Sequence, residues 1–168
     1  MGGSAYYFAY GSNMHVGRLR ERAPSAESIE VAELSNHQLM FNKRGRDGSG
    51  KCNLIARNAS CVYGVVYRID IKQWRSLDRA EGSGYGRRHL IVNGLSGGRP
   101  YRAFLYLAKT MSVDDALQPY DWYRDFVVLG AEQHGLPKTY VAQLWRVPVR
   151  GDPNGRRSRT QFNIMKHL

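Results

Sequence analysis

Cysteine is scarce in this chain. Only Cys52 and Cys61 occur among its 168 residues, so a disulfide framework is not expected and a reducing cytoplasm is the expected location. Long apolar runs are also missing, because no stretch approaches the ~18 residues of a membrane span. Residues 1–4 lack the basic and apolar regions of a secretory signal. No membrane partner is therefore expected.

Acidic residues are few, 14 against 25 lysines and arginines, which gives a formal net charge of +11. A basic balance favours anionic partners such as nucleic acid or a small acidic substrate. No nucleic-acid-binding module accompanies the charge, so a solvated surface is the simpler interpretation and a nucleic-acid partner is not expected. The basic side chains form three groups: Arg18, Arg20 and Arg22; Lys43, Arg44, Arg46 and Lys51; and Arg156, Arg157, Arg159 and Lys166.

Motifs for metals and nucleotides are absent. The five histidines are scattered and no Cys-x-x-Cys occurs, so no metal site is predicted. Residues 45–52 nearly fit the spacing of a phosphate-binding loop, but Cys52 stands where a Ser or Thr must hold magnesium. A flexible loop at the rim of a pocket explains the glycines of residues 45–52 better than a phosphate-binding loop does. Cys52 and Cys61 lie in apolar segments and are expected as small core residues.

Short apolar and aromatic runs alternate with turn residues along most of the chain. Helical spacing is limited to a short segment before Pro24 and to a few later stretches. Strands with few intervening helices indicate an α+β fold, expected as one domain over residues 1–147. Gly, Pro, Asn and Arg then dominate, and they predict a basic, loosely ordered tail over 148–168.

The predicted elements follow from these runs and from turn signals. A turn is predicted at 57–60, between two of the strands. Strands are predicted at 6–10, 28–34, 38–42, 52–56, 61–69, 85–92 and 99–107. Helices are predicted over 70–81, 120–134 and 138–146.

The helix that starts at Asp70 carries a carboxylate on its apolar side. Trp74, Leu77 and Glu81 stand at i, i+3 and i+7, and residues seven apart face the same way on a helix. A carboxylate that loses water there can act as a general base and return its proton. The simpler alternative is that Glu81 turns to solvent or pairs with a following arginine, Arg87 or Arg88. Asp78 is the competing carboxylate on this helix.

A second candidate element is the turn Gly11-Ser12-Asn13 after the first strand. Asn13 is predicted to cap a short helix. A strand that turns into a helix leaves backbone N–H groups free. Such groups bind a carboxylate or a developing oxyanion without a charged side chain.

Four segments stand in a definite order along the chain: 8–14 (FAYGSNM), 62–67 (VYGVVY), 77–82 (LDRAEG) and 129–137 (LGAEQHGLP). Together, by their order and spacing, they resemble the γ-glutamylcyclotransferase family, and the resemblance extends over about residues 6–144. The third segment is similar to the family's catalytic motif, whose glutamate corresponds to Glu81. The fourth resembles the C-terminal helical part of the animal glutathione-cycle enzymes.

The resemblance implies a small mixed β-barrel with flanking helices and a pocket at one barrel mouth. It implies a reaction without metal or cofactor, in which Glu81 serves as acid and base while a γ-glutamyl group closes to 5-oxoproline and releases its amine. The residues expected to bind the substrate are Tyr10, Gly11, Ser12, Asn13, Met14, Tyr85 and Tyr123.

The basic charge favours a γ-glutamyl-amino acid over a polycationic substrate, because like charges repel. Carboxylates of such a substrate are expected to meet Lys51 or Arg44. A monomer or a homodimer is compatible with the sequence. Two alternatives remain: a non-catalytic ligand-binding member of the same fold, and a basic nucleic-acid-binding protein.

Overall fold

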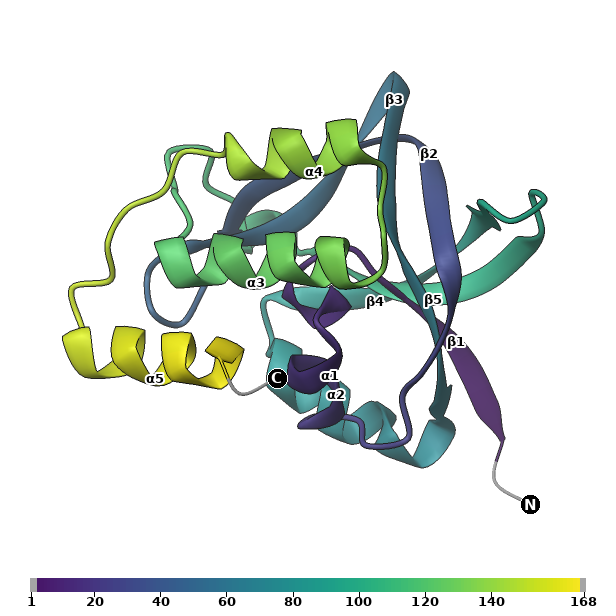
Figure 1. Cartoon of the computed structure of the whole chain (residues 1–168), viewed down its shortest axis with the longest axis horizontal. Coiled ribbons are helices and arrows are strands. Elements are labelled where there is room, and N and C mark those ends of the chain that lie inside the picture. Colours follow the sequence, from purple (N-terminus) through teal and green to yellow (C-terminus); the bar gives the residue numbers. More distant parts are fainter. Residues whose placement is uncertain (1–2, 167–168) are drawn as a thin grey trace.

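The computed structural model describes residues 3–166, so residues 1–2 and the last two residues of the expected tail lie outside it. Five strands close into a barrel in the order β1-β3-β2-β4-β5. All neighbours are antiparallel except β1 and β5, which are parallel. Helices flank the barrel (Figure 1), which confirms the expected α+β class. The strands are β1 (Ser4–Ala9), β2 (Glu27–Arg44), β3 (Gly50–Asp70), β4 (Tyr85–Gly94) and β5 (Pro100–Ala108).

Two long strands, β2 and β3, replace the four shorter ones that the sequence predicts. The turn predicted to join two strands at 57–60 is wrong, because these residues lie inside one strand, β3, which pairs with β2 on both sides of them, at Ala56 and at Cys61. The register shifts there, because residues 57–60 of β3 lie opposite the single residue Asn36 of β2, so the bulge is in β3. Asn36 and Ala59 both have positive φ, and the Asn36 side chain accepts a hydrogen bond from Ala59 N at 3.3 Å. The turn residues therefore mark a bulge inside one hairpin.

Helix α2 (Trp74–Glu81) lies between β3 and β4 and follows a short 3-10 turn, η2 (Ile71–Gln73). Asp70 begins this segment as predicted, since its carboxylate accepts from Lys72 N at 2.9 Å. Gly82 ends it with a φ of 81°. Leu77 is fully buried, which anchors α2 to the barrel and sets the direction of the side chain one turn later.

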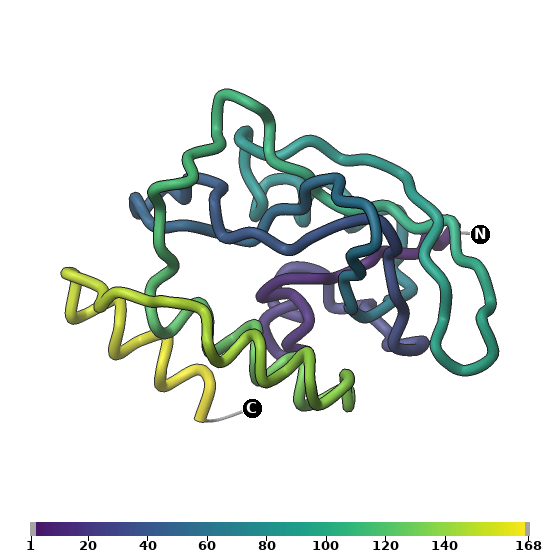
Figure 2. The backbone as a smooth tube through the Cα atoms, turned by 90° about the horizontal axis from the view of Figure 1, so that it is seen from above, coloured from purple at the N-terminus to yellow at the C-terminus, as the bar shows by residue number. Residues whose placement is uncertain are grey.

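Helices α3 (Asp121–Gln133) and α4 (Lys138–Trp145) cover one side of the strands, as the view from above shows (Figure 2). Helix α3 has a largely buried face, which packs on the segment after β1. Gly130 permits this contact: a Cβ there would lie 2.5 Å from His15 N. Within the described residues, no helix is both long and apolar enough to cross a membrane.

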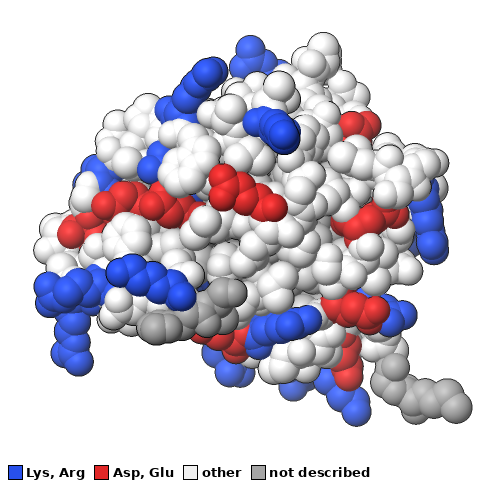
Figure 3. Space-filling model, viewed as in Figure 1, with Lys and Arg blue, Asp and Glu red and all other residues white. Residues whose placement is uncertain are grey.

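The loosely ordered tail expected over 148–168 is instead largely helical. Helix α5 (Gly155–Lys166) starts with Asn154 accepting from Arg157 N at 3.0 Å. The carboxylate of Asp152 binds Arg157 and also accepts from Trp122 Nε1 of α3 at 2.8 Å. These contacts fix the segment to the domain. Lys and Arg side chains gather over α5 on the outer surface (Figure 3).

Candidate active site

The turn after β1 has a different local structure from the one predicted. Residues 12–14 form a 3-10 turn, η1 (Ser12–Met14), and the next helix, α1 (Val16–Arg20), is capped by His15 rather than by Asn13. The Asn13 side chain is therefore free for tertiary contacts. Among the described residues, none accepts a hydrogen bond from the N–H groups of Gly11, Ser12 or Asn13. The predicted set of free main-chain donors is thus present.

Glu81, at the end of α2, faces this turn. Its Oε1 accepts a hydrogen bond from Asn13 Nδ2 at 2.7 Å and lies 3.6 Å from a nitrogen of Arg22. Arg22 in turn donates to Asn13 Oδ1 at 2.6 Å. The Glu81 side chain is 15% exposed. The carboxylate is therefore fixed at the mouth of the barrel by a donor from the first turn.

The arginines that offered a simpler role for Glu81 do not contact it. Arg87 pairs with Asp78 at 3.5 Å, and the Arg87 guanidinium lies over the ring of Trp74. Trp74 packs on Phe104 at the start of α2 and does not line the hollow around Glu81. The expected partnership of Glu81 with a tryptophan is therefore wrong; tyrosines surround the carboxylate instead.

A small inner hollow of about 30 Å³ separates Glu81 from the turn after β1. It opens into a larger outer pocket of about 200 Å³, and the two share Ser12, Glu81, Tyr85 and Tyr123. The barrel strands and α3 supply the remaining inner walls. The inner lining is Tyr7, Tyr10, Gly11, Ser12, Asn13, Cys52, Glu81, Tyr85, Tyr106 and Tyr123.

The three predicted tyrosines are held by the main chain. Tyr10 OH donates to Tyr106 O, Tyr85 OH donates to Cys52 O at 2.5 Å, and Tyr123 OH accepts from Cys52 N at 3.1 Å. Burial raises the pKa of Tyr10, Tyr85 and Tyr123 well above the ordinary phenol value. They therefore form a neutral, fixed wall of the inner hollow near neutral pH.

Cys52 also lines the inner hollow, but it is a poor nucleophile. Burial raises the pKa of its thiol to about 12, so the thiolate that reacts is not populated near neutral pH. Cys52 is a buried residue, as predicted, whereas Cys61 is only partly buried. Across residues 3–166, His, Cys, Asp and Glu side chains form no group of three that could hold a metal ion.

Cations surround the outer pocket. Its lining includes Arg18, Arg22, Lys43, Arg46 and Lys51 beside the carboxylates of Asp47 and Glu81. The tip of the β2–β3 hairpin, residues 45–49, forms one rim, as expected for the glycine-rich loop. Gly45 N donates to Ser49 O across this tip at 2.8 Å.

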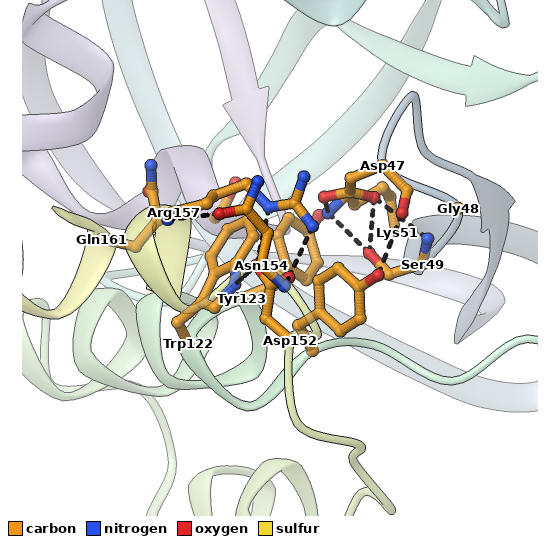
Figure 4. A network of polar contacts seen from close by, with 12 residues as sticks. Asp47, Gly48, Ser49, Lys51, Trp122, Tyr123, Asp152, Asn154, Arg157 and Gln161 are labelled. Atoms are coloured by element: carbon orange, nitrogen blue, oxygen red, sulfur yellow. Dashed lines mark hydrogen bonds and ion pairs between the residues drawn. The ribbon is translucent and has the colours of Figure 1, made fainter. Parts of the chain in front are cut away.

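Lys51 is already paired inside this pocket. Its ammonium binds Asp47 Oδ2 at 2.8 Å and lies over the rings of Trp122 and Tyr123 (Figure 4). Burial lowers the pKa of Lys51 to about 8, against the opposing effect of Asp47. Arg44, the other cation expected to meet a substrate, is exposed and pairs with Asp114. It does not line the pocket.

The structure brings together most of the predicted site residues. Met14 is the exception, because its side chain is fully buried and does not line either hollow. Sequence reasoning missed Tyr7 and Tyr106; strand alternation would have placed Tyr7 on the face opposite Tyr10. It also missed Arg22, for which the sequence holds no signal, since its contact with Glu81 spans 59 positions.

A family model matches half of the chain. The model of the AIG2-like family covers residues 61–144, which include Glu81 and the helix that carries it. The chain belongs to the AIG2-like family. This AIG2-like chain is 28% identical over 146 residues to the human protein named gamma-glutamylcyclotransferase, covering 84% of this chain and 77% of that protein. It is 29% identical to the mouse protein of the same name.

Solved structures agree with these similarities. A structure named gamma-glutamyl cyclotransferase superposes on the AIG2-like chain with a TM-score of 0.89 and 28% identity, covering 99% of this chain and 100% of that one. A yeast structure titled as a glutathione-specific γ-glutamylcyclotransferase shares the fold alone, at a TM-score of 0.64 and 13% identity. The expected family resemblance and fold are confirmed.

Proposed function

We propose that this protein is a γ-glutamylcyclotransferase, which closes a γ-glutamyl group to 5-oxoproline and releases the linked amine. One observation carries the proposal: the Glu81 carboxylate is fixed by Asn13 across a small hollow from the free N–H groups of residues 11–13. The similarity to proteins named gamma-glutamylcyclotransferase supports it.

The reaction begins with Glu81 as base. Its carboxylate takes a proton from the α-ammonium of the substrate, and the freed amine attacks the γ-amide carbonyl carbon. A new C–N bond closes a five-membered ring, and the carbonyl oxygen becomes an oxyanion. Because both reacting groups belong to one molecule, the enzyme needs only to fold the substrate into the attacking conformation.

The second half of the reaction breaks the original amide bond. The oxyanion collapses, the C–N bond to the amine breaks, and Glu81 returns a proton to the departing nitrogen. The attacking nitrogen is positively charged after ring closure and gives up a second proton, which Glu81 also passes to the leaving nitrogen. Two protons thus move from the attacking nitrogen to the leaving nitrogen, with no net gain or loss. No water, metal or nucleotide enters this balance.

The main-chain donors and the tyrosines position the substrate in this scheme. The N–H groups of Gly11, Ser12 and Asn13 hold either the α-carboxylate of the substrate or the oxyanion. Both are anions, and main-chain N–H groups stabilise an anion by donating hydrogen bonds to it. Tyr10, Tyr85 and Tyr123 enclose the glutamyl chain. Their neutral, hydrogen-bonded hydroxyls keep the wall fixed while protons pass through Glu81 alone.

The partner implied by this function is a small γ-glutamyl compound. The cytoplasm suits such an enzyme, and the two cysteines, both free in the structure, are compatible with a reducing compartment. A non-catalytic ligand-binding protein would keep the hollow without the reaction, so turnover separates the two functions.

The test is release of 5-oxoproline from γ-glutamyl-alanine, measured by chromatography. We expect turnover by the wild type and a loss of at least about 100-fold in Glu81→Gln, the usual scale of a positioned acid–base group. Absence of 5-oxoproline with every γ-glutamyl-amino acid tried would refute the enzyme and leave the binding protein. An undiminished rate in Glu81→Gln would move the acid–base role to another residue.

A further inference from the structure

Two cations of the outer pocket, one buried and one half-buried, have no carboxylate in direct contact. Lys43 is only 6% exposed, and Arg18 is half-buried; both line the outer pocket. Among residues 3–166, no carboxylate oxygen lies within 4 Å of the Lys43 ammonium or the Arg18 guanidinium. Because a buried charge is costly unless it is paired, this arrangement calls for an anion from outside the chain.

Lys43 is held by features that leave its ammonium available to a ligand. Its Nζ lies 4.4 Å from the centre of the Tyr85 ring and makes no hydrogen bond within the described residues. Gly84 makes room for it, since a Cβ at that position would lie 2.9 Å from Lys43 Cε and 3.3 Å from Nζ. The ammonium therefore lies between the Tyr85 ring and the main chain at Gly84, which has no side chain.

Arg18 is anchored from the other side of the pocket by neutral groups. Its Nε donates to Ser12 Oγ at 3.1 Å, one terminal nitrogen donates to Gln161 Oε1 at 3.1 Å, and the guanidinium lies over the Phe126 ring. Burial lowers the pKa of Arg18 to about 10. These contacts orient the guanidinium while leaving its charge unmatched.

The other charges of the pocket are matched or solvated. Lys51 pairs with Asp47 at 2.8 Å, and Arg22 lies 3.6 Å from Glu81. Arg46 is exposed, so water screens its charge. Lys43 and Arg18 therefore remain as two positive charges without an ion pair; Glu81 acts on both only from a longer distance.

We propose that the outer pocket is a subsite for the amine part of the substrate and that it selects an acidic amino acid there, with two carboxylates. The inference rests on the proposed function. The pocket shares Ser12, Glu81 and Tyr85 with the inner hollow, so an amine that leaves from Glu81 enters it. An acidic amino acid brings an α-carboxylate and a side-chain carboxylate, one for each unmatched cation.

The first test compares γ-glutamyl-glutamate with γ-glutamyl-glutamine on the wild-type enzyme. The two substrates have the same length and differ by one charge on the leaving amino acid. We expect kcat/KM to be at least about tenfold higher for the glutamate compound, because tenfold is the scale of one charge-assisted hydrogen bond. The difference should lie mainly in KM. Equal values, or a preference for the glutamine compound, would overturn the subsite.

The second test removes one cation. Lys43→Met keeps a long side chain without the charge, and Arg44→Met is the matched control, because Arg44 is the next residue along β2 and lies outside the pocket. We expect the glutamate-to-glutamine ratio of kcat/KM to fall at least about fivefold in Lys43→Met and to stay unchanged in Arg44→Met. A ratio that survives Lys43→Met contradicts the proposal.

A third measurement reads the pocket without turnover and keeps the two proposals distinct. Free L-glutamate should raise the melting temperature of the wild type more than L-glutamine at equal concentration, because only the former has two carboxylates. Equal shifts count against the subsite. If 5-oxoproline forms equally from both substrates, the enzyme function stands and the subsite fails; if it forms from neither, the enzyme function fails and the subsite with it.

Discussion

The inner hollow and the outer pocket meet at Glu81, yet they are built from opposite chemistry. The inner hollow has neutral tyrosines, main-chain N–H groups and one carboxylate. The outer pocket has five cations and two carboxylates. Closing a γ-glutamyl ring is the same reaction whatever amine is attached, so its machinery can be neutral and rigid. Recognition of the amine, in contrast, depends on the charge of that amine. The cations line the outer pocket, which the departing amine enters from Glu81.

Two carboxylates on α2 offer the sharpest test of the inner hollow. Glu81→Gln should lower kcat by about 100-fold or more, because the titrating group is lost while the shape is kept. Asp78→Asn is the matched control: Asp78 is 42% exposed, binds Arg87 and accepts from Tyr106 OH. It should change kcat less than about threefold. Steady-state kinetics with γ-glutamyl-alanine would measure both, and equal losses would contradict the distinct role of Glu81.

Asn13 tests whether the carboxylate must be held in place. Asn13→Ala removes the donor to Glu81 and the acceptor for Arg22, so kcat should fall about tenfold, less than the ~100-fold that a 1 Å misplacement can cause. Asn42→Ala is the control, since Asn42 is equally buried but binds Asp115 and Asn53 away from the hollow. A similar loss of kcat in both variants would mean that Asn13 acts only through stability.

Removing the charge of Lys51 or of Lys43 in the outer pocket should have different effects on stability. Lys51→Met leaves Asp47 without its partner and should lower the free energy of unfolding by about 2 kcal/mol. Lys43→Met removes an unmatched charge and should leave that free energy unchanged or raise it by up to about 1 kcal/mol. Urea denaturation measures both. Destabilisation of similar size in the two variants would show that Lys43 has a partner after all.

The smallest expected effect is on the pH dependence of selectivity. Burial lowers the pKa of Lys43, an effect that Glu81 and Asp47 oppose and Arg46 reinforces. Lys43 therefore loses its charge at a lower pH than an exposed lysine does. The glutamate-to-glutamine ratio of kcat/KM should decline as pH rises above neutral, because kcat/KM reports the free enzyme. Lys51, with a pKa of about 8, also loses its charge there, so Lys43→Met should weaken this dependence without abolishing it. A ratio that rises with pH, or a decline that is unchanged in Lys43→Met, would contradict the prediction.

The sequence predicts the local parts of this molecule well. The helix with Glu81, its start at Asp70 and its end at Gly82 follow from spacing and caps. The turn with Gly11 and its free donors follows from a strand that meets a helical segment. Each of these features depends on residues a few positions apart, where the sequence pattern directly reflects the geometry.

Contacts between distant residues could not be predicted in this way. The hydrogen bond from Asn13 to Glu81 joins residues 68 positions apart, and the pairing of Lys51 with Asp47 depends on how one hairpin tip folds. Helix α5 was missed because its anchor, the contact of Asp152 with Trp122, is tertiary. The turn predicted at 57–60 failed because pairing with β2 holds the chain on both sides of these residues, at Ala56 and Cys61, so they form a bulge within one strand.

The hairpin between β2 and β3 concentrates much of the outer pocket in one short piece of chain. Lys43, Gly45, Arg46, Asp47 and Lys51 all come from it, whereas Asn13 and Glu81 come from elsewhere. Replacing residues 43–51 with another hairpin could therefore retarget the enzyme to a different amine while sparing ring closure. Variation in this one peptide offers a simple route by which related sequences diversify their substrates.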